Sequence, residues 1–107
     1  MQITKLENMT KGWFVGDFSP TLLRTKDFEV AIKHYRAGDK EQKHIHRVAQ
    51  EITAIASGKV RMGQHILIAG DIALIEPGEA TDFEALADSI TVVVKTPSIA
   101  NDKFTAE

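Results

Sequence analysis

The stretch GDKEQKHIHRVAQEITAIASG, which runs from Gly38 to Gly58, carries the pattern that decides the fold of this chain. Between its end glycines lie three side chains of types that hold metal ions, His44, His46 and Glu51. Residues two apart in a strand point to the same side, so the two histidines are expected to project from one face. Glu51 reaches that face if the chain bulges or breaks register in the segment before it.

The sequence on either side of this stretch alternates between apolar and polar residues, which is typical of half-buried strands. Between 28 and 35 the alternation separates two faces, and the more apolar one is expected to point inward. That face carries Phe28, Val30, Ile32 and His34, whereas Glu29, Lys33 and Tyr35 share the other face with Ala31. Runs rich in β-branched residues at 66–69, 72–75 and 90–94 also favour strands.

Turn signals separate these runs at short intervals. They are Ser19-Pro20, Ala37-Gly38-Asp39, Ser57-Gly58-Lys59, Gly70-Asp71 and Pro77-Gly78. Gly58 and Gly78 are expected at positions that need a positive φ or a close approach. The segment 50–57 contains helix-forming alanines, but its flanking β pattern and Gly58 favour a strand. Many short strands at this spacing predict an all-β, antiparallel sandwich or barrel.

Composition limits the classes of protein that the chain can represent. Its 107 residues, 43% of them hydrophobic, are enough for one domain with a core and too few for two. The absence of cysteine excludes disulfides and thiolate metal sites. A net charge of −2 without a basic stripe makes nucleic acid an unexpected partner. No leader-like or membrane-length apolar segment is seen, so a cytoplasmic protein without membrane contact is expected.

The chemistry of His44, His46 and Glu51 points to a divalent transition metal. Two neutral imidazoles and one carboxylate form the facial set that holds non-haem iron, with open positions for substrate. Manganese, nickel or zinc could be held by the same ligands, because geometry and availability decide selectivity. The same three residues are also candidates for a catalytic role.

The spacing of these residues resembles the first motif of the cupin family at each of its fixed positions, between Gly38 and Gly58. The stretch GDIALIEPG, from Gly70 to Gly78, resembles the start of the second cupin motif. The resemblance implies one domain over 1–107, with the motifs at 38–58 and 70–83 and a C-terminal surface tail at about 96–107. It also implies a cupin-type antiparallel jelly-roll β-barrel whose ligands point into the lumen.

One position departs from the family pattern. The third histidine, expected soon after the Pro-Gly turn, is replaced by Thr81, and threonine is a poor ligand for a divalent ion. Asp82 is a better ligand but alternates to the opposite face. His34, on the apolar face of its strand, could supply the missing imidazole, act as a general base, or simply line the barrel. Metal binding is therefore expected to be weaker than with four ligands.

Several further residues carry expectations of their own. Thr53 and Ile55 follow Glu51 in alternation and are expected to line the lumen, with Thr53 orienting a ligand. Tyr35 is assigned to a surface or interface and His65 to a solvated loop. Outward apolar residues such as Ile52 and Ala54 predict a homodimer, because burying them between subunits is favourable. Trp13 and Phe14 are expected in a core-packed strand between glycines.

Three kinds of function fit these residues. The first is a metal-binding enzyme acting on a small polar molecule, a sugar or an organic acid, in the barrel mouth. The second is a metal-free catalyst, similar to sugar-nucleotide isomerases or epimerases with the cupin fold, in which the His-x-His pair moves protons. The third is a ligand-binding module without turnover. Fold alone does not choose among them.

Overall fold

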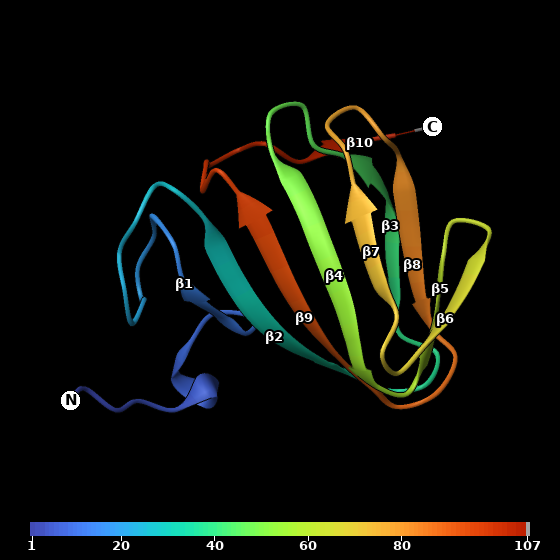
Figure 1. The fold of residues 1–107 in the computed structure, drawn as a ribbon, viewed down its shortest axis with the longest axis horizontal. Helices are drawn as coiled ribbons and strands as arrows, with labels where there is room; N and C mark the ends of the chain where they lie inside the picture. Colours follow the sequence, from blue (N-terminus) through green and yellow to red (C-terminus); the bar gives the residue numbers. More distant parts are fainter. Residues whose placement is uncertain (107) are drawn as a thin grey trace.

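The computed structural model describes residues 1–106, and within them the chain forms two antiparallel five-stranded sheets packed face to face (Figure 1). The first sheet has the order β1 (Trp13–Val15), β2 (Glu29–Tyr35), β9 (Ser89–Thr96), β4 (Gln50–Ser57) and β7 (Ile72–Ile75). The second has the order β10 (Phe104–Thr105), β3 (Lys40–Ile45), β8 (Thr81–Ala85), β5 (Lys59–Met62) and β6 (His65–Ile68). The only helix within 1–106 is the 3-10 turn η1 (Leu6–Asn8). This confirms the all-β, antiparallel jelly-roll prediction.

No helix within residues 1–106 is long and apolar enough to cross a membrane.

The apolar core occupies one end of the space between the sheets. Its members come from the four strands β4, β5, β7 and β8 and interleave across the two sheets. They are Ile55, Val60, Met62, Ile75, Phe83 and Ala85. Ile55 and Val60 are 2% and 0% exposed, which places the centre of the core near the β4–β5 turn.

Gly58 makes that turn possible. Its φ is +91°, a region that side-chain-bearing residues rarely adopt. A Cβ atom at this position would also collide with Ser89 Oγ and the backbone oxygen of Asp88. Gly78 has a φ of +83° but open space around it. The positive-φ prediction is confirmed at both glycines, and close packing adds a second constraint at Gly58.

The expected orientation of β2 is wrong. Glu29 and Ala31 are buried, and the odd-numbered face points into the barrel, so His34 is exposed and faces outward. The pairing of β2 with β9 explains the error, because Val30 lies beside Val94 and Ile32 beside Val92 on the outside. The inward face is the more polar one because its side chains, such as Lys33 and Lys95, line a cavity instead of packing in the core, so apolarity alone does not tell inside from outside.

Tyr35 also lies inside rather than at the surface. Its ring packs against Phe83 with centroids 4.4 Å apart, and its hydroxyl donates to Glu41 Oε1 at 2.9 Å. His65 is exposed, as expected, but it is the first residue of β6 rather than part of a loop. Trp13 lies in the expected strand β1 and is half-buried, at the rim of the interior instead of in the core.

The C-terminal segment is more than a surface tail. β10 pairs with β3, placing Phe104 beside Ile45. Ser98 and Asp102 are 6% and 7% exposed. The Arg47 guanidinium lies 4.0 Å from the centroid of the Phe104 ring, a contact that helps to hold the segment in place. The segment thus closes one edge of the second sheet beside the histidine motif.

The outer face of the first sheet is apolar along β4 and β7. Ile52 is paired with Leu74, and Ala54 with Ile72. Ile52, Leu74 and Ile72 are 39%, 55% and 70% exposed, as the outward orientation of Ile52 and Ala54 predicts. A homodimer through this face stays a prediction, which sedimentation over a range of concentrations would test.

Candidate functional site

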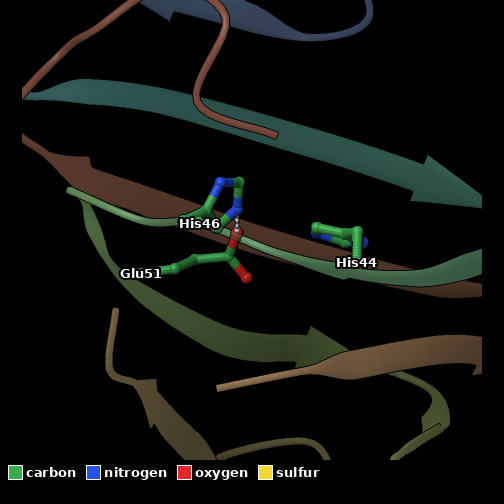
Figure 2. A group of neighbouring side chains, drawn as sticks. All are labelled: His44, His46 and Glu51. Carbon is green, nitrogen blue, oxygen red and sulfur yellow. Dashed lines mark ion pairs between the residues drawn. The ribbon is translucent and has the colours of Figure 1, made fainter. Parts of the chain in front are cut away.

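His44, His46 and Glu51 come together inside the barrel, next to the apolar core (Figure 2). One ligand atom from each lies within 4.8 Å of the others. His44 lies on β3, His46 directly follows that strand, and Glu51 is the second residue of β4. Because β3 and β4 belong to different sheets, the carboxylate reaches the histidines across a loop that joins the sheets, and a bulge within one strand is not involved.

Backbone carbonyls fix both imidazole rings. His46 Nδ1 lies 2.6 Å from the Asp102 carbonyl oxygen, and His44 Nδ1 lies 3.0 Å from the carbonyl oxygen of Gln42. A carbonyl oxygen only accepts, so each Nδ1 is the donor of its bond. In the neutral rings each Nε2 then carries a free lone pair, which is the arrangement of metal-bound histidines held by a second hydrogen bond.

The Nε2 atom of His46 faces the Glu51 carboxylate without a hydrogen bond. It lies 3.4 Å from Glu51 Oε1, is inaccessible to solvent and lacks a hydrogen-bond partner within residues 1–106. Glu51 Oε2 accepts from the Thr53 hydroxyl at 3.0 Å, so Thr53 orients a candidate ligand as expected. Two acceptors facing each other in a buried place repel unless a proton or a cation lies between them.

Without a bound metal, His46 and Glu51 each stabilise the charged form of the other. The neighbouring Glu51 carboxylate raises the pKa of His46, although burial opposes it, and the Asp102 carbonyl adds to the rise. Burial raises the pKa of Glu51, but the nearby His46 ring and the hydrogen bond from Thr53 outweigh it and leave this pKa below its ordinary value. The pair is thus a protonated imidazole and a carboxylate at mildly acidic pH.

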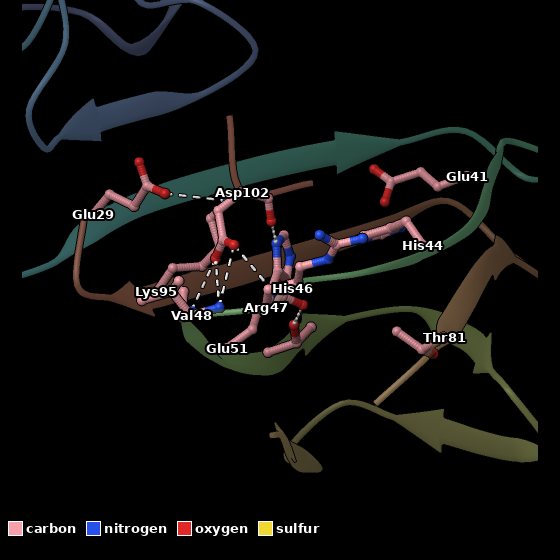
Figure 3. Close-up of polar contacts among 12 residues, drawn as sticks. Glu29, Glu41, His44, His46, Arg47, Val48, Glu51, Thr81, Lys95 and Asp102 are labelled. Atoms are coloured by element: carbon pink, nitrogen blue, oxygen red, sulfur yellow. Dashed lines mark hydrogen bonds and ion pairs between the residues drawn. The ribbon is translucent and has the colours of Figure 1, made fainter. Parts of the chain in front are cut away.

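Asp102 holds the loop that carries His46, and sequence reasoning missed it (Figure 3). Its carboxylate accepts from the backbone N–H groups of Arg47 at 3.0 Å, Val48 at 3.2 Å and Ala49 at 2.9 Å. These bonds outweigh the effect of burial and hold the pKa of Asp102 below its usual range. Asp102 lies 56 residues from His46, and no local pattern signals the contact.

The structure shows what stands at the place of the third histidine of the family motif, and that neither Asp82 nor His34 replaces it. Thr81 lies directly beside His44 in the β3–β8 pairing, at the place of the missing histidine, and its hydroxyl donates to the backbone of Asp82. The Asp82 carboxylate lies on Arg61, with Nη1 3.0 Å from Oδ1, and does not replace the missing ligand. His34 faces outward and does not replace it either.

A cavity of about 210 Å³ lies in front of the three residues. Aromatic, hydroxyl and charged side chains from both sheets surround it. Its wall is formed by Lys11, Trp13, Lys33, Tyr35, Glu41, His44, His46, Glu51, Thr53, Met62, Thr81, Asp82, Phe83, Thr91, Val93, Lys95 and Lys103. The lysines are a second feature that sequence reasoning missed, because they lie on different segments.

No protein-family model and no curated protein sequence matches this chain. Solved structures do match. An uncharacterised conserved protein with a double-stranded β-helix domain from Klebsiella pneumoniae is 24% identical, with a TM-score of 0.74 over 99% of this chain and 92% of the other.

Two further neighbours carry the word cupin in their descriptions. An RmlC-like cupin from Shewanella frigidimarina is 16% identical, with a TM-score of 0.65 over 72% of each chain. A sugar phosphate isomerase of the cupin superfamily from Silicibacter pomeroyi is 24% identical, with a TM-score of 0.61 over 65% of this chain and 50% of the other. Identities this low establish the fold and not the activity. The chain therefore folds as a cupin domain, a double-stranded β-helix, as the spacing of its two motifs predicts.

Proposed function

We propose that His44, His46 and Glu51 bind a divalent transition metal, and that the protein acts as an enzyme on a small polar molecule in the adjoining cavity. The observation that carries this proposal is the unpartnered Nε2 of His46, buried 3.4 Å from Glu51 Oε1. The residues fit a metal, since a cation between these two acceptors would satisfy both. Iron, manganese, nickel and zinc all accept this donor set.

A bound divalent metal would supply a Lewis acid with open positions for a substrate oxygen. The chain itself contributes the positioning. The Gln42 and Asp102 carbonyls hold the two rings, and Thr53 holds the carboxylate. The apolar side of the cavity, with Phe83 and Val93, limits water around the bound molecule. The cytoplasm is the proposed location, in keeping with a chain free of cysteine.

Calorimetry on metal-stripped protein, titrated separately with the four metals, tests the proposal. We expect binding that His44→Ala and Glu51→Gln weaken by at least about tenfold, since each removes a ligand. His34→Ala is the matched control, because this histidine is exposed on the outside of the same barrel. The His34→Ala variant should bind each metal with the same affinity as the unaltered protein.

Thr81→His provides a gain-of-binding test. The new imidazole would stand beside His44 in the strand pairing and complete a four-ligand set. We expect tighter metal binding than in the unaltered chain. Metal binding that neither His44→Ala nor Glu51→Gln reduces, or no binding of any of the four metals, would overturn the proposal.

The second candidate is metal-free acid–base catalysis, as in a sugar-nucleotide isomerase or epimerase. It is favoured by one observation, the rise in the pKa of His46 beside Glu51, which suits a proton-transfer group. Turnover that survives metal chelation and disappears in His46→Gln would support it. A ligand-binding module would instead bind its ligand without turnover in either the metal-free or the metal-bound form.

A further inference from the structure

Two lysines lie near the Trp13 ring at the cavity, but only one of them forms an ion pair. Lys33 Nζ lies 5.2 Å and Lys95 Nζ lies 5.1 Å from the ring centroid. Lys95 also pairs with Glu29 Oε1 at 3.1 Å, as Figure 3 shows for these two residues. Lys33 makes no ion pair with any carboxylate of residues 1–106.

The environment of Lys33 makes an unpaired ammonium costly. The side chain is half-buried on the inward face of β2, and burial lowers its pKa while Glu41 opposes the change. A buried charge without a partner is unfavourable, because water no longer solvates it fully. The ring face of Trp13 compensates for only part of this loss.

The carboxylates that line the cavity form no ion pair with Lys33 and make other contacts. Glu41 accepts the Tyr35 hydroxyl at 2.9 Å, Asp82 holds Arg61, and Glu51 belongs to the metal site. Exposed Lys11 and Lys103 add further positive charge to the wall. With a divalent ion in place the cavity would carry a net positive charge, and a positive cavity with low-dielectric walls concentrates anions.

We propose that the cavity takes a small molecule bearing a carboxylate or phosphate, and that Lys33 binds its anionic group while the rest of the molecule extends toward His44, His46 and Glu51. The second half of this statement rests on the proposed function. Lys33 is then a specificity-determining residue that favours acids and phosphorylated molecules over neutral sugars. The volume of about 210 Å³ is below that of typical drug-sized sites, which suits a ligand with few heavy atoms.

The test is calorimetric titration of the full chain with malonate, inorganic phosphate and uncharged malonamide, each in metal-free and manganese-loaded protein. We expect one or both anions to bind and malonamide not to bind. Lys33→Met should weaken anion binding at least about tenfold, as expected for a hydrogen bond to a charged group. Lys33→Arg should restore most of it. Lys59→Met, an exposed lysine outside the cavity wall, is the control and should leave binding unchanged.

The outcomes separate this inference from the metal proposal. Anion affinity unchanged in Lys33→Met, equal binding of malonamide, or no binding of either anion overturns the inference whatever the metal titrations give. If the protein fails to bind manganese, the metal proposal fails, but the anion titrations of metal-free protein still test the inference. Anion binding that depends on Lys33 in that protein would support it. A preference for malonate over phosphate points to a carboxylic acid, and the reverse to a phosphate.

Discussion

The two ends of the barrel interior differ in chemistry although the same strands build both. Along β4 the inward side chains change from Glu51 through Thr53 to Ile55 within five residues. Ile55 packs in an entirely apolar cluster, whereas Glu51 lies among hydrogen-bonding and charged groups. The core end stabilises the barrel, and this stability lets the other end hold polar groups in a fixed, partly desolvated arrangement.

The largest effect is expected from breaking the core end. Ile55→Ala should lower the free energy of unfolding by about 2–5 kcal/mol, because it deletes buried methyl groups and leaves a cavity. Urea denaturation measures this change. Ile3→Ala, at a side chain 84% exposed in the N-terminal segment, is the control and should change stability by no more than about 0.5 kcal/mol. Equal losses of stability in the two variants would contradict the conclusion that the core end stabilises the barrel.

Gly58→Val should destabilise the turn that closes the same end. The cost is roughly 2–4 kcal/mol, since strain at positive φ adds to a collision with Ser89 and the backbone of Asp88. Gly70→Val is the matched control, with a φ of +95° and open space around the new side chain, so it should show the strain alone. Thermal melts compare the two. Metal affinity at 20 °C should be unchanged in the folded fraction of each variant.

Asp102→Ala should act on both properties at the polar end. It removes the acceptor of three loop N–H groups, which we expect to lower stability by about 1–3 kcal/mol. Metal affinity should fall about tenfold, because the loop positions His46. Denaturation and calorimetry on the same sample measure the pair of effects. A loss of stability with unchanged metal affinity would show that the loop supports the fold without positioning the ligand.

The smallest effect is expected from pH. In metal-free protein the raised pKa of His46 contributes stability below its ordinary value of 6.5, and this is lost as pH rises through the raised value. The lowered pKa of Glu51 contributes above its ordinary value of 4.5 and is lost as pH falls through the lowered value. The melting temperature should therefore contain a contribution that is greatest between these ordinary values and absent in His46→Gln.

Added metal should reverse the pH dependence of the melting temperature in the range where His46 loses its proton. A metal needs the neutral imidazole, so the stabilisation by metal should increase as pH rises through the histidine range. Melting curves with and without zinc or manganese measure the difference. A stabilisation by metal that is the same at pH 5 and pH 8 would contradict binding through His46.

Much of the strand pattern and the ligand set could be predicted from the sequence. Ile72–Ile75 and the segment 50–57 form strands as expected, because alternation and β-branched residues report local backbone preference. The joint location of His44, His46 and Glu51 follows from their short separation in the chain. Orientation could not be predicted for β2, because its more apolar face, with Val30 and Ile32, points outward and its polar face lines the cavity. The pattern therefore places His34 inside and Tyr35 outside, the reverse of the structure.

The rest depends on contacts between residues distant in the sequence. Asp102 reaches the loop after His46, and Lys33 meets Trp13 and the cavity, only once β10 and β1 have paired with their neighbours. By itself the sequence determined a β-rich chain, the spacing of its turns and the types of ligand at the site. Only the tertiary structure decided which face of each strand is enclosed and which charges are left without a partner, because burial and pairing are set by strands that meet across the barrel.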